Sequence, residues 1–397
     1  MRKKIKDKID RRGGPATRGV TVVYGKDVSI MAKQLLIDTG AIDRIRPQSV
    51  VVIKPNLVVS RAQWKGVNTD PAAVEALIEI LKRFGVSQIT VADGSGMGYT
   101  ATKAFEICGY SAMAKRYGLR LVDLERDRFV KIPVRLDGPF ESLEIAQTVL
   151  ECDFLINMPV MKAHTFTSIT CSLKNLKGVM PRSLKTKFHS VDLNRAIAQL
   201  NSIVTPHLIL VDGIQGDLSS ETGYTPVRME RLLMGTNPVE VDSVVADMLG
   251  YVPRSIPHLD YSAAGGLGNC DLEKISVQDL NLPVQGKYFH TQVEYTKRFH
   301  CRISAEGACC TCLGNLLFAL ERLKEQRLLT KEQFFFIGQN PGKIPVEKAL
   351  KIAVGKCAAN LYEADIEIPS CPPSAGNIYR RVISALGKAS KSSGQSA

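Results

Sequence analysis

Residues that could bind a metal are concentrated in the last quarter of the sequence. Six of the ten cysteines lie between Cys301 and Cys371. A Cys-x-x-Cys pattern joins Cys309 to Cys312, and two more cysteines follow, in Gly-Lys-Cys357 and in Ser-Cys371-Pro-Pro. Four converging thiolates are the usual ligands of an iron–sulfur cluster, and a Cys-x-x-Cys turn can supply two of them. We therefore predict a [4Fe–4S] cluster held by Cys309, Cys312, Cys357 and Cys371.

Zinc is the alternative metal, because it also takes four thiolates, in tetrahedral geometry. Structural zinc sites usually pair two short Cys-x-x-Cys loops, whereas Cys357 and Cys371 are 14 residues apart. Two other interpretations are a redox-active thiol pair at Cys309-Cys310 and buried cysteines that bind no metal. Cys310 could replace Cys309 as a ligand, and Cys301 is a spare thiol.

A second group of reactive side chains lies between Phe154 and Val191, where six basic residues occur without any carboxylate. Lys162, Lys174 and Lys177 alternate there with apolar residues, as in a partly buried segment. Cations this crowded repel one another unless an anion or distant carboxylates balance them. We therefore expect a small anionic ligand held by these lysines, the alternative being a solvated basic loop.

Two histidines in the same segment could move protons. His164 lies two residues after Lys162, and His189 follows Lys187. Histidine is the side chain whose unperturbed pKa suits proton transfer near neutrality. His164, His189 and Lys162 are the predicted catalytic residues.

Short β-branched runs alternate with helical patterns along the chain, which predicts an α/β fold with a largely parallel sheet flanked by helices. A smaller cysteine-containing module is expected to follow it. The expected strands are Val20–Tyr24, Ser49–Ile53, Ile89–Ala92, Leu119–Val122, Phe154–Ile156 and Leu208–Val211, and the clearest helices begin at Asp70-Pro71 and span Thr102–Tyr117.

Three of these strands end in polar motifs, namely Lys54-Pro55-Asn56, Asp93-Gly94 and Asp212-Gly213. In open α/β sheets, ligands bind outside the carboxyl ends of the strands. Turn formation is the plainer explanation for each Asp-Gly pair taken alone. Buried carboxylates such as Asp93, Asp212 or Asp242 could balance the lysines where an anionic ligand does not. The predicted ligand-binding residues are Lys54, Asn56, Asp93, Lys174, Asn175, Lys177 and Asp212.

The formal charge of +13 is concentrated at the two ends of the chain. Residues 1–20 hold eight basic and two acidic residues, and residues 375–397 hold four basic and no acidic ones. The remainder is nearly balanced, so composition argues against a surface that coats nucleic acid. The predicted divisions are a basic flexible tail (1–19), an α/β domain (20–295), the cysteine module (296–376) and a flexible Lys/Ser/Gly-rich tail (377–397).

With these motifs, the chain resembles the domain of unknown function 362 (DUF362) family over about residues 50–250. The resemblance implies an α/β domain that often accompanies iron–sulfur modules, and it implies no settled reaction. Asn237 stands where we expect Asp, and Glu240 where we expect a small residue. The motifs are Lys54-Pro55-Asn56-Leu57, Thr69-Asp70-Pro71, Ala92-Asp93-Gly94, Ile156-Asn157-Met158-Pro159 with Lys162 and His164, Ser172-Leu173-Lys174-Asn175-Leu176-Lys177-Gly178, His189, Val211-Asp212-Gly213 and Gly235-Thr236-Asn237-Pro238-Val239-Glu240-Val241-Asp242.

No stretch of the sequence approaches the length of an apolar membrane span, and the charged N-terminus lacks the apolar segment of a signal peptide. We therefore expect a cytoplasmic iron–sulfur protein, linked to redox chemistry or electron transfer, that could act as an oxidoreductase on an anionic small molecule. An electron-transfer protein as partner and assembly into a homo-oligomer stay open. The alternative is a zinc-stabilised protein that binds a nucleotide or phosphorylated metabolite without redox chemistry.

Overall fold

The computed structural model describes residues 19–62, 64–164, 166–218, 221, 223, 226–282, 291–340, 349–361 and 363–392. The chain forms two compact units. The first comprises Met1–Lys162, Ile169–Asp217 and Glu221–Tyr288, and the second comprises Ala163–Ser168, Leu218–Ser220 and Phe289–Ala397. Apart from Gly19, the predicted basic tail lies outside the described residues.

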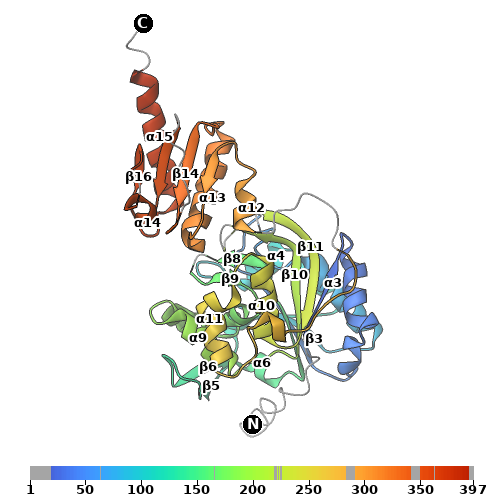
Figure 1. Ribbon diagram of the computed structural model, residues 1–397. Coiled ribbons are helices and arrows are strands. Elements are labelled where there is room, and N and C mark those ends of the chain that lie inside the picture. The colour runs from blue at the N-terminus through green and yellow to red at the C-terminus, as the bar shows by residue number, and fades with distance from the viewer. Residues whose placement is uncertain are drawn as a thin grey trace. The chain divides into compact units, whose positions relative to one another are not determined.

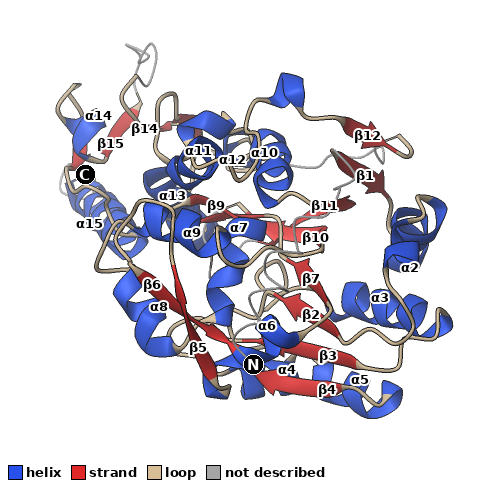
Figure 2. Cartoon of the chain, turned by 90° about the horizontal axis from the view of Figure 1, so that it is seen from below, coloured by secondary structure: helices blue, strands red, loops and turns tan. Residues whose placement is uncertain are grey.

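The described part of the first unit contains an eight-stranded sheet in the order β12-β1-β11-β10-β7-β2-β3-β4. Strands β10, β7, β2, β3 and β4 run parallel, whereas β11 is antiparallel to both β1 and β10. Figure 2 shows β4, β3, β2 and β7 in this order. The bounds are β1 (Val20–Tyr24), β2 (Val51–Pro55), β3 (Ile89–Asp93), β4 (Arg120–Asp123), β7 (Phe154–Met158), β10 (Leu208–Asp217), β11 (Pro226–Gly235) and β12 (Val277–Asp279).

Helices cover both faces of this sheet, as expected for an α/β fold. On one face, Val51 and Ile53 of β2 pack in a core with Leu77 of α3, and on the other Val52 packs in a core with Val149 of α6. The helices of this unit are α2 (Val28–Lys33), α3 (Pro71–Arg83), α4 (Ala101–Ile107), α5 (Tyr110–Tyr117), α6 (Gln147–Glu151), α7 (Ser172–Asn175), α8 (Arg182–Phe188), α9 (Leu193–Asn201), α10 (Pro238–Met248) and α11 (Pro257–Ala264).

The described residues also form two separate pairs of strands. β5 (Phe129–Pro133) and β6 (Ser142–Ala146) form an antiparallel pair, and β8 (Lys162–His164) pairs with β9 (Ser168–Thr170).

Helix α3 begins where the sequence predicted. Asp70 is its N-cap, since the carboxylate accepts a hydrogen bond from the Ala72 amide at 2.9 Å, and Pro71 occupies the first turn. The single helix expected over Thr102–Tyr117 is instead two helices, α4 and α5. Gly109 separates them with a φ of 84°, a left-handed conformation that ends one helix and starts the next.

The second unit contains, among its described residues, a four-stranded parallel sheet in the order β13-β14-β15-β16. Figure 1 labels two of its strands, β14 and β16. Helices α13 and α15 belong to this unit, and they pack against each other. The elements are α12 (Gln292–Thr296), β13 (Arg302–Ser304), α13 (Cys310–Glu325), β14 (Gln333–Ile337), β15 (Leu350–Val354), α14 (Lys356–Ala359), β16 (Ile366–Ile368) and α15 (Ala375–Ser392).

The C-terminal segment differs from the predicted flexible tail, because helix α15 extends to Ser392. Ile378 and Val382, four residues apart on one face of the helix, are both fully buried. Tyr379 also accepts a hydrogen bond from Gln326 at 2.6 Å. Composition did not indicate this buried apolar face, because the segment is rich in basic and small residues. No helix among the described residues is long and apolar enough to cross a membrane.

We expect Ile378→Ala to lower the free energy of unfolding by about 2–4 kcal/mol, because it leaves a cavity under α15. Urea unfolding followed by circular dichroism measures this. Arg381→Ala, on the exposed side of the same helix, is the matched control and should change stability by less than about 0.5 kcal/mol. Equal effects of the two changes would show that α15 is not packed.

Candidate functional site

A buried ion pair lies at the carboxyl edge of the large sheet. Lys54 at the end of β2 and Asp93 at the end of β3 are almost completely buried, and their Nζ and Oδ1 atoms are 2.6 Å apart. The second oxygen of Asp93 accepts the Leu57 amide at 2.7 Å. Burial lowers the pKa of Lys54, and Asp93 opposes that shift. Two of the predicted ligand-binding residues therefore bind each other.

A chain of amide side chains extends from this pair. Asn175 Oδ1 accepts hydrogen bonds from Lys54 Nζ at 3.1 Å and from Asn56 Nδ2 at 2.8 Å. The Asn175 amide nitrogen donates to Asn157 Oδ1 at 2.7 Å, and Asn157 donates to Ser172 Oγ at 2.9 Å. All these groups are buried and hydrogen-bonded, so they fix the start of the basic segment onto the strand ends.

The glycine of the Ser-Leu-Lys-Asn-Leu-Lys-Gly motif is explained by this packing. A Cβ on Gly178 would collide with Asp93 Oδ1 and would lie 2.8 Å from Lys54 Nζ. A Cβ on Gly94 would in turn lie 2.7 Å from the carbonyl oxygen of Gly178. Asp93-Gly94 is therefore more than a turn, because its glycine lets the basic segment approach the ion pair.

Among the described residues, Asp212 and Asp242 form no ion pair with the lysines, so they do not supply the charge balance for which they were candidates. Asp212 accepts the backbone amides of Asp70 at 2.7 Å and Ile214 at 3.0 Å, and Asp242 accepts those of Ser172 at 2.7 Å and Leu173 at 2.9 Å. Burial raises the pKa of each carboxyl to about 7. They hold the starts of α3 and α7 in place.

The motif around Asn237 positions Asp242. Asn237 Oδ1 caps α10 by accepting the amides of Val239 and Glu240, while its Nδ2 donates to the carbonyl of Leu267 at 2.9 Å. An aspartate can supply the cap but, when ionised, not the donated bond. The departure from the expected Asp therefore has a structural reason.

Lys162 is fully buried and its ammonium group is already satisfied. Nζ donates to Asn56 Oδ1 at 3.0 Å and to the carbonyl oxygens of Val67 at 2.6 Å and Glu221 at 3.1 Å. Three acceptors match the three hydrogens of an ammonium. Burial nevertheless lowers its pKa to about 7.

Two other cations of the basic segment are neutralised by a carboxylate that the sequence did not point to. Glu125 forms ion pairs with Arg182, at 2.6 Å, and with Lys185. Lys185 also donates to the carbonyl oxygen of Ser95 at 2.8 Å. Glu125 lies in the segment after β4, outside the motifs considered above, so no local pattern could have revealed it.

Lys174 and Lys177 have binding capacity left over. Within the described part of the chain, Lys174 forms no hydrogen bond or ion pair. Lys177 Nζ lies 3.1 Å from His189 Nε2 and 5.7 Å from the centre of the Phe188 ring, and it forms no ion pair with a described carboxylate. Burial lowers the pKa of both lysines to about 7, and the neighbouring ammonium groups contribute to the shift. Glu221 is the carboxylate that acts on both in the opposite direction, and sequence reasoning missed it.

His189 and His164 are in different settings. His189 is exposed, yet the packing around its ring and then the charges of Lys177 and Lys174 lower its pKa to about 4. His164 belongs to the second unit, and its Nδ1 accepts the Phe166 amide at 2.9 Å. The structure thus places His189 beside Lys177.

The four cysteines predicted to bind a cluster lie at the carboxyl edge of the small parallel sheet. Cys309 and Cys312 follow β13 and lie at the N-terminus of α13, Cys357 follows β15, and Cys371 follows β16. Cys309, Cys357 and Cys371 are exposed and Cys312 is buried. The positive end of the α13 dipole favours thiolates at this place. The side chain of Cys310 is outside the described residues.

The other three cysteines all affect the pKa of the Cys312 thiol. A hydrogen bond with Cys309 is the largest cause of a raised Cys312 pKa, followed by burial and by the charges of Cys309, Cys371 and Cys357. No group of three or more His, Cys, Asp or Glu among the described residues is arranged to hold a single metal ion. The donors of a four-iron cluster stand farther apart than those of one ion, because the cluster lies between them.

Comparison with known proteins agrees with the motifs. Residues 51–247 match the model of a family described as domain of unknown function (DUF362). A thylakoid-associated protein of Synechocystis sp. is 24% identical over 220 residues, which cover 54% of this chain and 67% of that protein.

Two solved structures are distantly similar. The lactate racemase apoprotein from Thermoanaerobacterium thermosaccharolyticum is 12% identical with a TM-score of 0.36, over 56% of this chain and 55% of that one. A protein from Thermotoga maritima is also 12% identical with a TM-score of 0.39, over 61% and 60% of the two chains. This chain therefore spans less than two thirds of either.

We expect Lys177→Met to raise the pKa of His189, because it removes the nearest positive charge. The pKa should stay below 6.5, since packing around the ring is the larger cause. Titration of the histidine ring protons by NMR measures the shift. Lys187→Met, which changes an exposed lysine of α8, is the control and should leave His189 almost unaffected. A fall in the His189 pKa in Lys177→Met would contradict the arrangement.

Proposed function

Since residues 51–247 are a domain of the DUF362 family, we propose that this protein is an iron–sulfur protein. A [4Fe–4S] cluster on the second unit serves redox or electron-transfer chemistry, and the α/β domain binds a small anion. The observation that carries the proposal is the gathering of Cys309, Cys312, Cys357 and Cys371 at one edge of the small sheet.

The order of the small sheet supports this ligand set. All four strands are parallel, so the loops that follow β13, β15 and β16 leave the sheet on the same side. Cysteines separated by up to 62 residues can thereby serve one cluster. Gly355, before Cys357, has a φ of 91°, and a Cβ there would lie 3.8 Å from Cys312 Sγ. The loop that carries Cys357 therefore runs close to Cys312.

A [4Fe–4S] cluster supplies one-electron chemistry when it is bound. The chain's own contribution is to hold four thiolates in place, three of them exposed and one buried. Exposure of cluster ligands is one of the factors that set a cluster's reduction potential. It also leaves this edge accessible to an electron-transfer partner.

The anion site on the α/β domain is formed by Lys174 and Lys177, with His189 beside Lys177. Among the described residues, neither Glu125 nor a set of carbonyl groups satisfies these two lysines, which are buried or half-buried. A bound anion would favour their charged forms, because it supplies the missing opposite charge. His189 is neutral at physiological pH, and an anion bound beside it would raise its pKa toward the range in which it can accept a proton. Lys162 and the Lys54–Asp93 pair position the segment.

We expect anaerobically purified protein to be brown, with broad visible absorption and about four iron atoms per chain. Cys371→Ser and Cys312→Ser should each lose most of the iron and the electron paramagnetic resonance signal of the reduced cluster. Cys301→Ser, which removes the spare thiol, is the matched control and should keep both. A folded, iron-free protein with one zinc per chain would establish the zinc-stabilised alternative instead.

We expect sulfate, used as a probe anion at constant ionic strength, to raise the Tm of the wild type. The double variant Lys174→Gln, Lys177→Gln should bind sulfate about tenfold or more weakly, because charged hydrogen bonds to the anion are lost. Binding should also weaken as the pH rises above about 7, where the free lysines lose their protons. Lys187→Gln is the control. If it weakens binding equally, the proposed anion site is wrong.

A further inference from the structure

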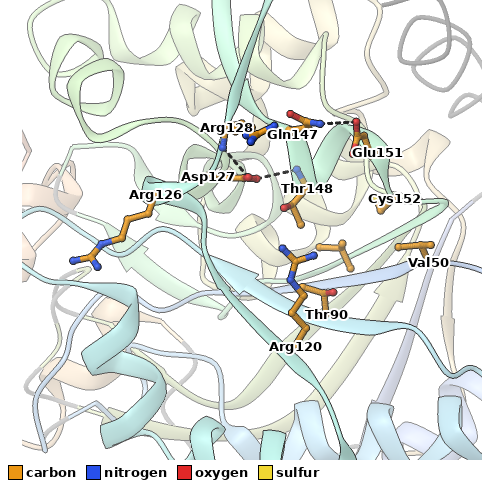
Figure 3. A pocket seen from close by; sticks show the side chains of 11 residues that line it. Val50, Thr90, Arg120, Arg126, Asp127, Arg128, Gln147, Thr148, Glu151 and Cys152 are labelled. Atoms are coloured by element: carbon orange, nitrogen blue, oxygen red, sulfur yellow. Dashed lines mark hydrogen bonds between the residues drawn. The ribbon is translucent and has the colours of Figure 1, made fainter. Parts of the chain in front are cut away.

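A pocket of about 540 Å³ opens on the first unit at the opposite edge of the sheet from Lys54 and Asp93. Val50 directly precedes β2, Thr90 lies near the start of β3, and Arg120 begins β4, so the pocket is at the amino ends of the parallel strands (Figure 3). Its volume is within the range of small-molecule sites. None of the motifs discussed above contributes to it.

Three arginines from a short stretch of sequence line this pocket. Arg126 lies 3.8 Å from Asp123, and in Figure 3 its side chain points away from the others. Arg120 and Arg128 are exposed, and within the described part of the chain their guanidinium groups form no hydrogen bond or ion pair. In the same figure the guanidinium of Arg120 points toward the middle of the pocket.

The two acidic residues that line the pocket are engaged elsewhere. Asp127 accepts the backbone amides of Arg128 and Thr148, both at 2.8 Å, and Glu151 accepts the side-chain amide of Gln147 at 2.7 Å. Neither forms an ion pair with Arg120 or Arg128. Among the described residues, no ion pair within the pocket therefore neutralises the two guanidinium groups.

The remaining lining is uncharged and, besides Gln147 and Cys152, consists of apolar and hydroxyl-bearing residues. Val50 and Val52 contribute an apolar surface, and Thr90 and Thr148 contribute hydroxyl groups. Guanidinium groups bind phosphate through paired, charge-assisted hydrogen bonds. A ligand that matches both parts carries a phosphate together with an organic skeleton.

We propose that this pocket binds an organic phosphate, with Arg120 and Arg128 holding the phosphate and Val50 and Val52 contacting the carbon skeleton. The residues of this pocket are different from the cysteines and the lysines of the proposed function. Its test can therefore fail without affecting that proposal, and the reverse also holds.

The test uses AMP as the organic phosphate, inorganic phosphate as the bare anion, and adenosine as the skeleton without phosphate. Isothermal titration is done on the full chain carrying Lys174→Gln and Lys177→Gln, so that the lysines cannot bind the probes. Adding Arg120→Gln and Arg128→Gln should weaken AMP binding at least about tenfold. Both arginines are exposed, so circular dichroism should show an unchanged fold. Arg116→Gln, an exposed arginine on α5 outside the pocket, is the matched control.

Stronger binding of AMP than of inorganic phosphate, both dependent on the two arginines, supports the proposal. Adenosine should not bind measurably. The proposal is overturned if AMP does not bind, if adenosine binds as tightly as AMP, or if Arg116→Gln weakens AMP binding as much as the pocket variants do.

Discussion

The first unit is organised around one buried ion pair, between Lys54 and Asp93. A buried ammonium or carboxylate is tolerated only when it is paired and hydrogen-bonded. Lys54 meets this requirement with Asp93 and Asn175, and Asp93 meets it with Lys54 and the Leu57 amide. Because these partners come from two strand ends and from the basic segment, the pair determines where that segment can lie. Gly178 follows from the same constraint, since any side chain there would displace the pair.

The same principle divides the cations of the basic segment into structural and available groups. Lys162 is satisfied by Asn56 and backbone carbonyls, and Lys185 by Glu125. Lys174 and Lys177 remain without such partners in the described structure, and burial lowers the pKa of both to about 7. Buried cations with unused hydrogen-bond donors and perturbed pKa values are candidates for a binding site. A lysine of this segment is therefore a candidate ligand-binding residue only when other groups of the protein do not already pair with its ammonium group.

The alternation of strands and helices was predictable because it depends on local patterns. The first and last residues of β2 and β3 lie within two positions of the predicted ones, and α3 starts at Asp70-Pro71 as expected. Predictions from local patterns were wrong where contacts between distant residues determine the structure. Gly109 divides a helix that periodicity predicted as continuous, and Ile378 and Val382 bury one face of a helix in a segment whose composition indicated a flexible tail. Neither the basic segment nor the cysteine pattern indicated Glu125 or Glu221, because their partners are distant in sequence.

By itself, the sequence determined the α/β class, the family motifs and the residue types that could bind an anion or a metal, since these depend on composition and short-range spacing. Only the tertiary structure decided which of those residues lie together. It paired Lys54 with Asp93, assigned Asp212 and Asp242 to helix starts, and left Lys174 and Lys177 available. It also brought the cysteine loops to one edge of a parallel sheet. The physical reason is that a charge or thiol takes its role from its neighbours, and strand order determines those neighbours.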